Sequence, residues 1–346
     1  MTPDLDHIYV GDALTIMRSW PDNFIQCCVT SPPYWGLRDY GIAGQLGMEP
    51  SPEEYVTKMV EVFREVKRVL RDDATFWLNI GDTFADSGKG SYAGPKQATN
   101  VGSVGINPFP IPSGLKSKDL IGIPWRLAFA LQSDGWYLRS DVIWSKNNPM
   151  PESVTDRPTK SHEYLFLLTK NPTYYYDNDA IKEPAIYFDL ADDGPNKSQI
   201  FSRDHPERAQ NPKALYKDAR SYEGKHSDKQ RGHGRRHAGF NERWDAMTKI
   251  EQCQGMRNKR SVWTVPTMGF PEAHFATFPP NLIKPCVLAG SRQGDIVFDP
   301  FMGSGTTALV ALQYNRKFLG IELNPIYVEM AYKRIAAEQA QVKMAI

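Results

Sequence analysis

Two short motifs near opposite ends of the 346-residue chain contain candidate catalytic and binding residues. The first motif is Ser31-Pro32-Pro33-Tyr34, which follows the apolar run 24–29. Pro33 has no N–H group, so no donor within the turn competes for its carbonyl oxygens. The Ser31 hydroxyl and the Pro32 carbonyl could accept both N–H groups of a planar amine, and Tyr34 could stack on its ring. A proline turn that simply closes a strand is the alternative for this motif alone.

The second motif is a glycine-containing loop that follows the apolar run 296–298 and precedes a predicted helix. Glycines let the backbone turn sharply at a strand end, and the N–H groups of the helix point toward a ligand there. Glu322 ends the next predicted strand, where a carboxylate can accept hydrogen bonds from ribose hydroxyls. The pattern indicates a nucleotide-type cofactor, with a tight strand–helix turn as the alternative. The candidate binding residues in the loop are Asp299, Phe301, Gly303, Ser304, Gly305 and Thr306.

The spacing of apolar residues predicts the elements that must position these two motifs. Strands alternate with helices up to about residue 179, and again from about residue 279. This alternation predicts an α/β fold with a doubly wound, mostly parallel, Rossmann-like sheet. We expect one catalytic domain in two chain segments, 1–179 and 262–346, interrupted by an insert at 180–261. The predicted strands are 7–10, 24–29, 74–80, 136–144, 163–169, 296–298 and 318–322, and the predicted helices are 13–19, 51–70, 123–133, 281–289, 306–314 and 325–337.

The insert is strongly basic, although the net charge of the whole chain is only +1. Residues 197–260 contain 16 Lys and Arg against 8 Asp and Glu, which gives +8 and leaves 1 − 8 = −7 for the rest of the chain. Such a segment is either a solvated loop or an element that binds a polyanion. We expect the cluster Arg231, Arg235, Arg236 and His237 to contact DNA phosphates or guanine edges.

Composition excludes several classes of protein. No apolar run approaches the roughly 20 residues that span a bilayer, and the N-terminus lacks the pattern of a signal peptide. We therefore expect a cytoplasmic protein without membrane contact. The four cysteines form no C-x-x-C pair, so we expect neither a metal site nor a disulfide framework.

The motifs resemble those of the amino-methylating DNA methyltransferases. TSPPYW is similar to their catalytic motif and FDPFMGSGTT to their cofactor motif, and the order, with the catalytic motif first, is that of the beta group. The segments GWYLRSDVIWSKNNPMPES and RPTKSHEYLFLLTK are similar as well. The resemblance implies direct transfer of a methyl group from S-adenosylmethionine to an exocyclic amine of a base flipped out of double-stranded DNA.

The resemblance also implies roles for individual residues. Ser31, Pro32, Pro33 and Tyr34 would hold the target base, and the residues of the glycine loop would line the cofactor. Asp12 would face the cofactor adenine, Phe278 would contact its methionine end and Glu322 would bind its ribose. A homodimer and a cognate restriction endonuclease are partners known for this group.

N4 of cytosine is favoured over N6 of adenine as the methyl acceptor. This preference rests mainly on the resemblance, because SPPY is the commoner form among the cytosine-N4 enzymes. The neutral Ser31 hydroxyl can both donate and accept, but each of the two amines lies beside a ring-nitrogen acceptor, so the hydroxyl does not distinguish them. The alternatives are N6 of adenine, RNA or protein glutamine as substrate, an NAD-dependent oxidoreductase, and a DNA-binding protein without activity. The absence of G-x-G-x-x-G and of a Walker lysine disfavours NAD and ATP.

Overall fold

The computed structural model describes residues 2–37, 40–85, 114–184, 256–267 and 278–344. The chain divides into two compact units, one formed by Met1–Ile181 with Arg260–Ile346 and the other by Lys182–Lys259. The second unit begins two residues later and ends two residues earlier than the insert expected from the sequence. Within the described part of that unit, β6 (Glu183–Pro184) pairs antiparallel with β7 (Met256–Arg257).

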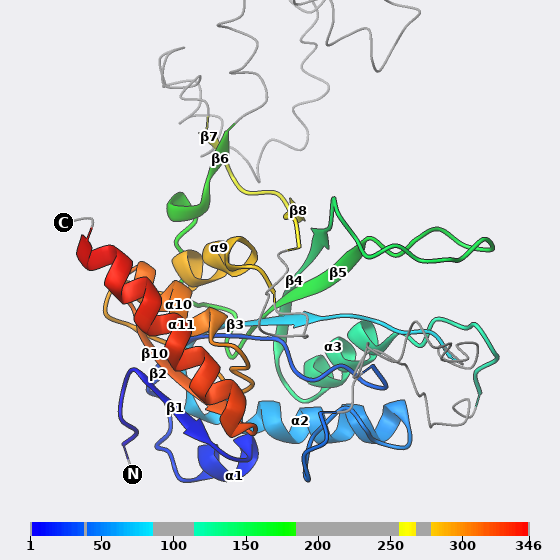
Figure 1. Ribbon diagram of the computed structural model, residues 1–346, viewed down its shortest axis with the longest axis horizontal. Helices are drawn as coiled ribbons and strands as arrows, with labels where there is room; N and C mark the ends of the chain where they lie inside the picture. Colours follow the sequence, from blue (N-terminus) through cyan, green and yellow to red (C-terminus); the bar gives the residue numbers. More distant parts are fainter. Residues whose placement is uncertain (1, 38–39, 86–113, 185–255, 268–277, 345–346) are drawn as a thin grey trace, which may run out of the picture. The chain divides into compact units, whose positions relative to one another are not determined.

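The first unit is built on a mostly parallel eight-stranded sheet, as the sequence predicts (Figure 1). Its strand order is β1-β10-β9-β2-β3-β5-β4-β8. Only β5 runs against its neighbours β3 and β4. The strands are β1 (His7–Val10), β2 (Ile25–Thr30), β3 (Leu70–Ile80), β4 (Tyr137–Ser145), β5 (His162–Thr169), β8 (Val262–Thr264), β9 (Ile296–Asp299) and β10 (Lys317–Glu322).

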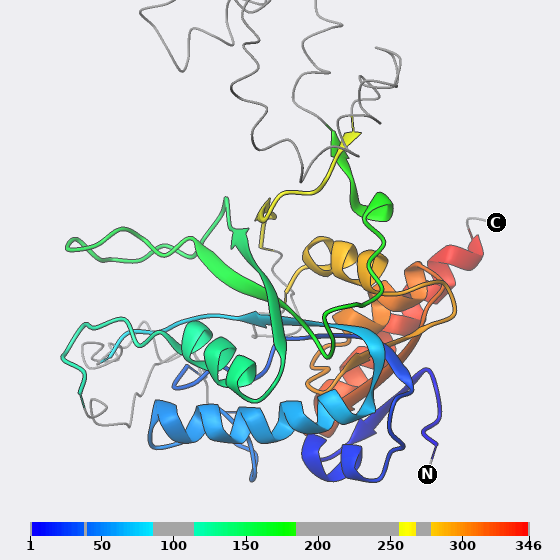
Figure 2. The ribbon, with the colours of Figure 1, turned by 180° about the vertical axis from the view of Figure 1, so that it is seen from behind.

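Helices cover both faces of this sheet, which makes it doubly wound (Figures 1 and 2). One face packs against α1 (Ala13–Arg18), α2 (Pro52–Val69) and α3 (Ile123–Ser133). The other face packs against α9 (Pro280–Gly290), α10 (Thr306–Gln313) and α11 (Pro325–Met344). A short 3₁₀ turn, η1 (Asp179–Ile181), closes the N-terminal segment.

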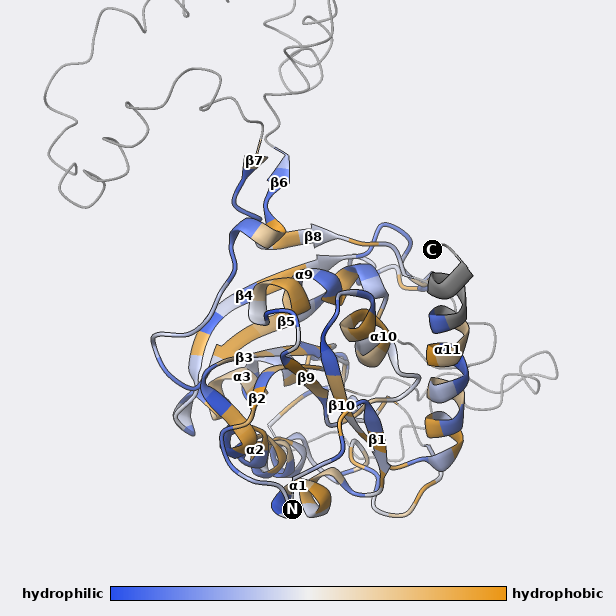
Figure 3. Ribbon diagram, turned by 90° about the vertical axis from the view of Figure 1, so that its left-hand side faces the viewer, coloured by the Kyte–Doolittle hydropathy of each residue, from blue (hydrophilic) through white to orange (hydrophobic). Residues whose placement is uncertain are grey.

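The two cores follow from the alternation of side chains along each strand. In β2, Cys28 faces the helices α1–α3, whereas Cys27 and Val29 face α9–α11. Figure 3 shows hydrophobic residues on the central strands and hydrophilic residues on the connections around them. Helix α2 begins with Ser51 as its N-cap and Pro52 in its first turn, which is a favourable start for a helix.

Three features of the sheet differ from the sequence expectation. Strand β3 starts at Leu70, directly after α2, so it is longer than predicted. The pairing of β5 between β3 and β4 was not predicted, because alternation of elements does not reveal strand direction. The short strand β8, which pairs with β4 at the edge, was not predicted either.

Candidate active site

The two sequence motifs meet at the carboxyl edge of the sheet. Strands β2 and β9 are parallel neighbours, with Cys27 opposite Val297 and Cys28 opposite Phe298. Strands β2 and β9 lie side by side and run the same way (Figure 3), so the turn that begins at Ser31 and the loop that follows β9 leave the sheet at the same edge. Ligands of open α/β sheets bind at this edge.

Asp299 connects the two motifs directly. Its Oδ1 accepts hydrogen bonds from Thr30 Oγ1 at 2.5 Å and from the Phe301 N–H at 3.0 Å, and its Oδ2 accepts one from Thr307 Oγ1 at 2.7 Å. The residue is only 1% exposed, and burial raises the pKa of its carboxyl group to about 6. Asp299 therefore ties the end of β2 to the loop. It has little surface left for a ligand.

The glycine loop takes its shape from backbone conformations that favour glycine. Gly303 and Gly305 have φ values of 52° and 81°. A Cβ atom on Gly305 would lie 2.8 Å from the Cβ of Ala331, so the loop packs tightly against α11. Gly305 is also the N-cap of α10, whose N–H groups face the end of the sheet.

Glu322 closes the other side of the loop from the end of β10. Its Oε2 accepts the Gly303 N–H at 2.8 Å, and its Oε1 accepts the Asn324 N–H at 2.8 Å. Burial raises the pKa of this carboxyl group, and the hydrogen bonds oppose that effect. Since each carboxylate oxygen can accept a second hydrogen bond, Glu322 retains acceptor capacity for hydroxyl groups.

Asp12 lies one strand away from Glu322. Strand β1 pairs with β10, and Val10 stands opposite Glu322. Asp12 follows directly as the exposed N-cap of α1, where its Oδ1 accepts from Thr15 N at 2.8 Å and from Thr15 Oγ1 at 2.6 Å. The two carboxylates and the glycine loop thus share one edge. This set of donors and acceptors fits a nucleotide-type cofactor.

The side chains of Ser304 and Thr306 face the protein. Arg334 of α11 donates through Nη1 to Ser304 Oγ at 3.0 Å and to Thr306 Oγ1 at 2.9 Å. Both residues are buried, so their side chains shape the loop. Phe301 packs against the α1–α3 core, and Phe278 is buried in the α9–α11 core just before α9.

The Ser31–Tyr34 turn is held in place from two sides. Tyr55 of α2 donates to the Pro33 carbonyl at 2.9 Å. The ring of Tyr34 lies on Gly81, because a Cβ atom there would be 2.6 Å from Tyr34 Cε2. Pro32 is buried, while Ser31 is only partly buried at the mouth of the turn.

Three polar residues that the sequence analysis did not assign complete this side. The Tyr34 hydroxyl donates to Glu163 Oε2 at 2.8 Å and lies 3.2 Å from Asn79 Oδ1. Lys146 forms an ion pair with Glu163 Oε1. Of these three residues, only Glu163 could have been suspected from the sequence, because it places a carboxylate at the start of the apolar strand β5.

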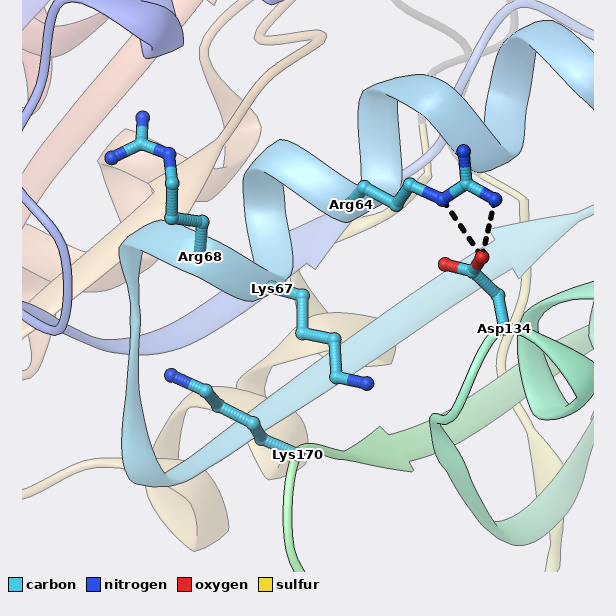
Figure 4. A pocket seen from close by; sticks show the side chains of 5 residues that line it. All are labelled: Arg64, Lys67, Arg68, Asp134 and Lys170. Carbon is cyan, nitrogen blue, oxygen red and sulfur yellow. Dashed lines mark hydrogen bonds and ion pairs between the residues drawn. The ribbon is translucent and has the colours of Figure 1, made fainter.

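One surface hollow lies away from this edge, and the expected DNA contacts are not among the residues that the structure describes. Arg231, Arg235, Arg236 and His237 are outside the described residues. A hollow of about 420 Å³ occurs at the opposite edge, near the start of β3 (Figure 4). The charged side chains that line it interact with other groups of the protein. For example, Arg64 Nη2 lies 2.6 Å from Asp134 Oδ1. The lining residues are Arg64, Lys67, Arg68, Asp134 and Lys170.

Known proteins are similar to this chain in sequence. The DNA methylase family of N6 and N4 methyltransferases matches residues 25–333. The Type II methyltransferase M.Cfr9I of Citrobacter freundii is 44% identical over 335 residues, which cover 97% of this chain and 89% of that protein. M.SmaI of Serratia marcescens is 42% identical, with coverage of 95% and 90%.

Solved structures share the fold at lower identity. The PvuII DNA methyltransferase, described as cytosine-N4-specific, aligns with a TM-score of 0.56 at 16% identity, covering 99% of this chain and 93% of that one. TTHA0409 of Thermus thermophilus, a DNA modification methylase solved with S-adenosylmethionine, gives 0.53 at 21% identity, with coverage of 96% and 93%. The match of the family over most of the chain and the identity to full-length relatives lead to one conclusion: the chain belongs to the DNA methylase family of N6 and N4 amino-methyltransferases.

Proposed function

We propose that this protein transfers the methyl group of S-adenosylmethionine to N4 of a cytosine flipped out of double-stranded DNA. One observation carries the proposal: Asp299 binds both Thr30, which precedes the Ser31–Tyr34 turn, and the loop at Phe301–Thr307. The candidate amine pocket and the candidate cofactor loop are therefore fixed to each other through a single buried carboxylate.

The cofactor side of the site would bind and orient the donor. A bound S-adenosylmethionine supplies a sulfonium methyl group that is already activated for transfer. Glu322 would accept hydrogen bonds from its ribose hydroxyls, and Asp12 would face its adenine. Gly303 and Gly305 would let the backbone approach the ligand closely, and Phe278 would lie toward the methionine end.

The amine side would align the acceptor nitrogen. The Ser31 hydroxyl and the Pro32 carbonyl would accept the two N–H groups, which draws the nitrogen lone pair out of conjugation with the ring. Tyr34 would pack on the base. Alignment of donor and acceptor supplies roughly 7–11 kcal/mol in the best cases, and the surrounding oxygens stabilise the positive charge that develops on the nitrogen.

Duplex DNA would be recognised by the basic insert. Flipping a base costs a few kcal/mol, which phosphate contacts and stacking offset. The charge of +8 over residues 197–260 supports such contacts, with Arg231, Arg235, Arg236 and His237 as candidates. The relatives are named Type II methyltransferases, which supports a cognate restriction endonuclease as a partner. We also propose a cytoplasmic location and a homodimer. In the described part of the chain, no helix has the length and apolar character needed to cross a membrane.

The choice of N4 of cytosine over N6 of adenine is supported by the SPPY form of the motif, through its resemblance to the cytosine-N4 enzymes. Purified protein, S-adenosylmethionine and duplex DNA would be incubated together, and the nucleosides would be analysed by mass spectrometry. We expect N4-methylcytosine. N6-methyladenine alone would overturn the choice of base, and 5-methylcytosine would overturn transfer to an amine.

A further inference from the structure

A chain of hydrogen bonds leads from the candidate amine pocket to a charged group behind it. Ser31 Oγ donates to Tyr34 Oη at 3.3 Å, and Tyr34 Oη donates to Glu163 Oε2 at 2.8 Å. The other carboxylate oxygen of Glu163 binds Lys146 Nζ. The chain thus begins at the mouth of the turn and ends on β5, without passing through the cofactor loop.

The direction of this chain follows from the groups that form it. An ionised carboxylate can only accept, so Tyr34 must donate to Glu163. The Tyr34 oxygen is then free to accept the Ser31 proton, which leaves the Ser31 lone pairs for an amine. Burial raises the pKa of Tyr34 well above its usual range, so the phenol keeps its proton at neutral pH.

The groups behind the turn are fixed by their neighbours. The Asn79 amide donates to Glu163 Oε2 at 3.3 Å and to the Tyr164 carbonyl at 3.0 Å. Lys146 Nζ lies 4.4 Å from the centre of the Trp144 ring, and its side chain is only 18% exposed. The Glu163 side chain is 15% exposed, so it meets little bulk water.

We propose that Ser31, Tyr34 and Glu163 form a proton relay that deprotonates the amine as it is methylated. The proposal rests on the proposed function. An N–H bond of the amine breaks and its proton binds Ser31 Oγ. The Ser31 proton passes to Tyr34 Oη, and the Tyr34 proton passes to Glu163 Oε2. The methylated amine ends neutral, and Glu163 ends as a carboxylic acid that later loses its proton to water.

Glu163 acts through Tyr34 and Ser31, so it is a positioning residue as well as the final proton acceptor. If water accepted the proton directly, Glu163 would serve only to orient Tyr34. The two roles differ in their response to a diffusible carboxylate, because formate can replace a proton acceptor but cannot restore a packing contact.

The test uses the full chain, S-adenosylmethionine and unmethylated duplex DNA that contains the target sequence of the enzyme. The reaction is followed under single-turnover conditions. We expect Glu163→Gln and Tyr34→Phe each to slow methyl transfer by roughly 10²-fold, since each interrupts general-base catalysis. The double variant should be about as slow as the slower single variant, because both changes break one relay. Asp156→Asn, which removes an exposed carboxylate paired with Lys118, is the matched control and should keep the wild-type rate.

Chemical rescue separates the relay from a structural role. Formate should speed Glu163→Ala several-fold, whereas chloride at equal ionic strength should not. Affinities for cofactor and DNA, and thermal unfolding, would be measured for every variant. Additive effects in the double variant, wild-type rates in both single variants, or no rescue by formate would overturn the relay. Those results leave the proposed function intact as long as the wild-type protein methylates a base amine; failure of the wild-type protein to do so overturns the function itself.

Discussion

Replacing Asp299 by asparagine should change how stability depends on pH. Burial raises the pKa of the Asp299 carboxyl group to about 6 from a reference value of 3.8. The folded protein therefore binds this proton more tightly than the unfolded chain does. The contribution of Asp299 to stability is complete below about pH 4 and is lost as pH rises through about 6. The shift of about 2 pKa units corresponds to about 3 kcal/mol, since one unit is 1.36 kcal/mol.

Asp299→Asn removes this titration and keeps the shape of the side chain. Its Oδ1 can still accept from Thr30 and the Phe301 N–H, and its amide can donate to Thr307. Urea unfolding of both proteins would be measured at pH 4, 5, 6 and 7. Relative to wild type, the free energy of unfolding of the variant should rise by about 2 kcal/mol between pH 4 and pH 7, because part of the total change occurs outside this range. A difference that stays constant with pH would refute the buried, titrating carboxylate.

Asp299→Ala distinguishes the charge of Asp299 from its hydrogen bonds. The alanine leaves the hydroxyls of Thr30 and Thr307 buried without this acceptor, at a cost of about 1–3 kcal/mol each. We expect lower stability, together with losses in both cofactor binding and methyl transfer, because the end of β2 at Thr30 is no longer bonded to the loop through this carboxylate. If the variant lost only cofactor binding or only methyl transfer, the connecting role of Asp299 would be contradicted.

Four further changes test separate parts of the protein. Tyr34→Ala should lower the rate of single-turnover methylation far more than cofactor affinity, whereas Glu322→Ala should weaken cofactor binding first. Calorimetry would measure cofactor binding and rapid quench would measure methylation, and the opposite pattern would contradict the two assignments. Gly305→Ala should lower the free energy of unfolding by about 1–3 kcal/mol more than Gly294→Ala, because both have φ near +80° but only Gly305 meets an α11 methyl group, at 2.8 Å; equal losses would contradict the packing. Replacing residues 197–260 by a short linker should abolish sequence-specific DNA binding but keep cofactor binding. For the wild-type protein, the logarithm of the DNA-binding constant should fall by roughly 0.9 per phosphate contact for each tenfold increase in salt concentration. Unchanged sequence selectivity in the shortened protein would contradict a role of the insert in DNA recognition.

The sequence predicts the strands and helices of the first unit well because their patterns are local. Apolar runs, the cap at Ser51 and the glycines at 303 and 305 are readable without knowing any partner. The sequence also predicts that two loops leave strand ends. It does not predict that β2 and β9 are neighbours, because that pairing joins positions some 270 residues apart in the chain.

The contacts within the site depend on such distant pairings, so the sequence could not reveal them. Glu163 reaches Tyr34 only because β5 inserts beside β3, in the opposite direction. Arg334 reaches the glycine loop from a helix near the end of the chain. The Asp299 carboxyl group, expected to line the cofactor, holds Thr30 and the loop, and only the packed structure shows these contacts and its burial.

Methylation of DNA in living cells tests the central claim most directly. The protein would be produced in a bacterial host that lacks DNA methylation, and the genome would be sequenced by a method that detects modified bases. We predict N4-methylcytosine at one recurring sequence, and its loss when Ser31 is replaced by alanine. A genome without any methylated exocyclic amine, from cells that contain the folded protein, would contradict the account.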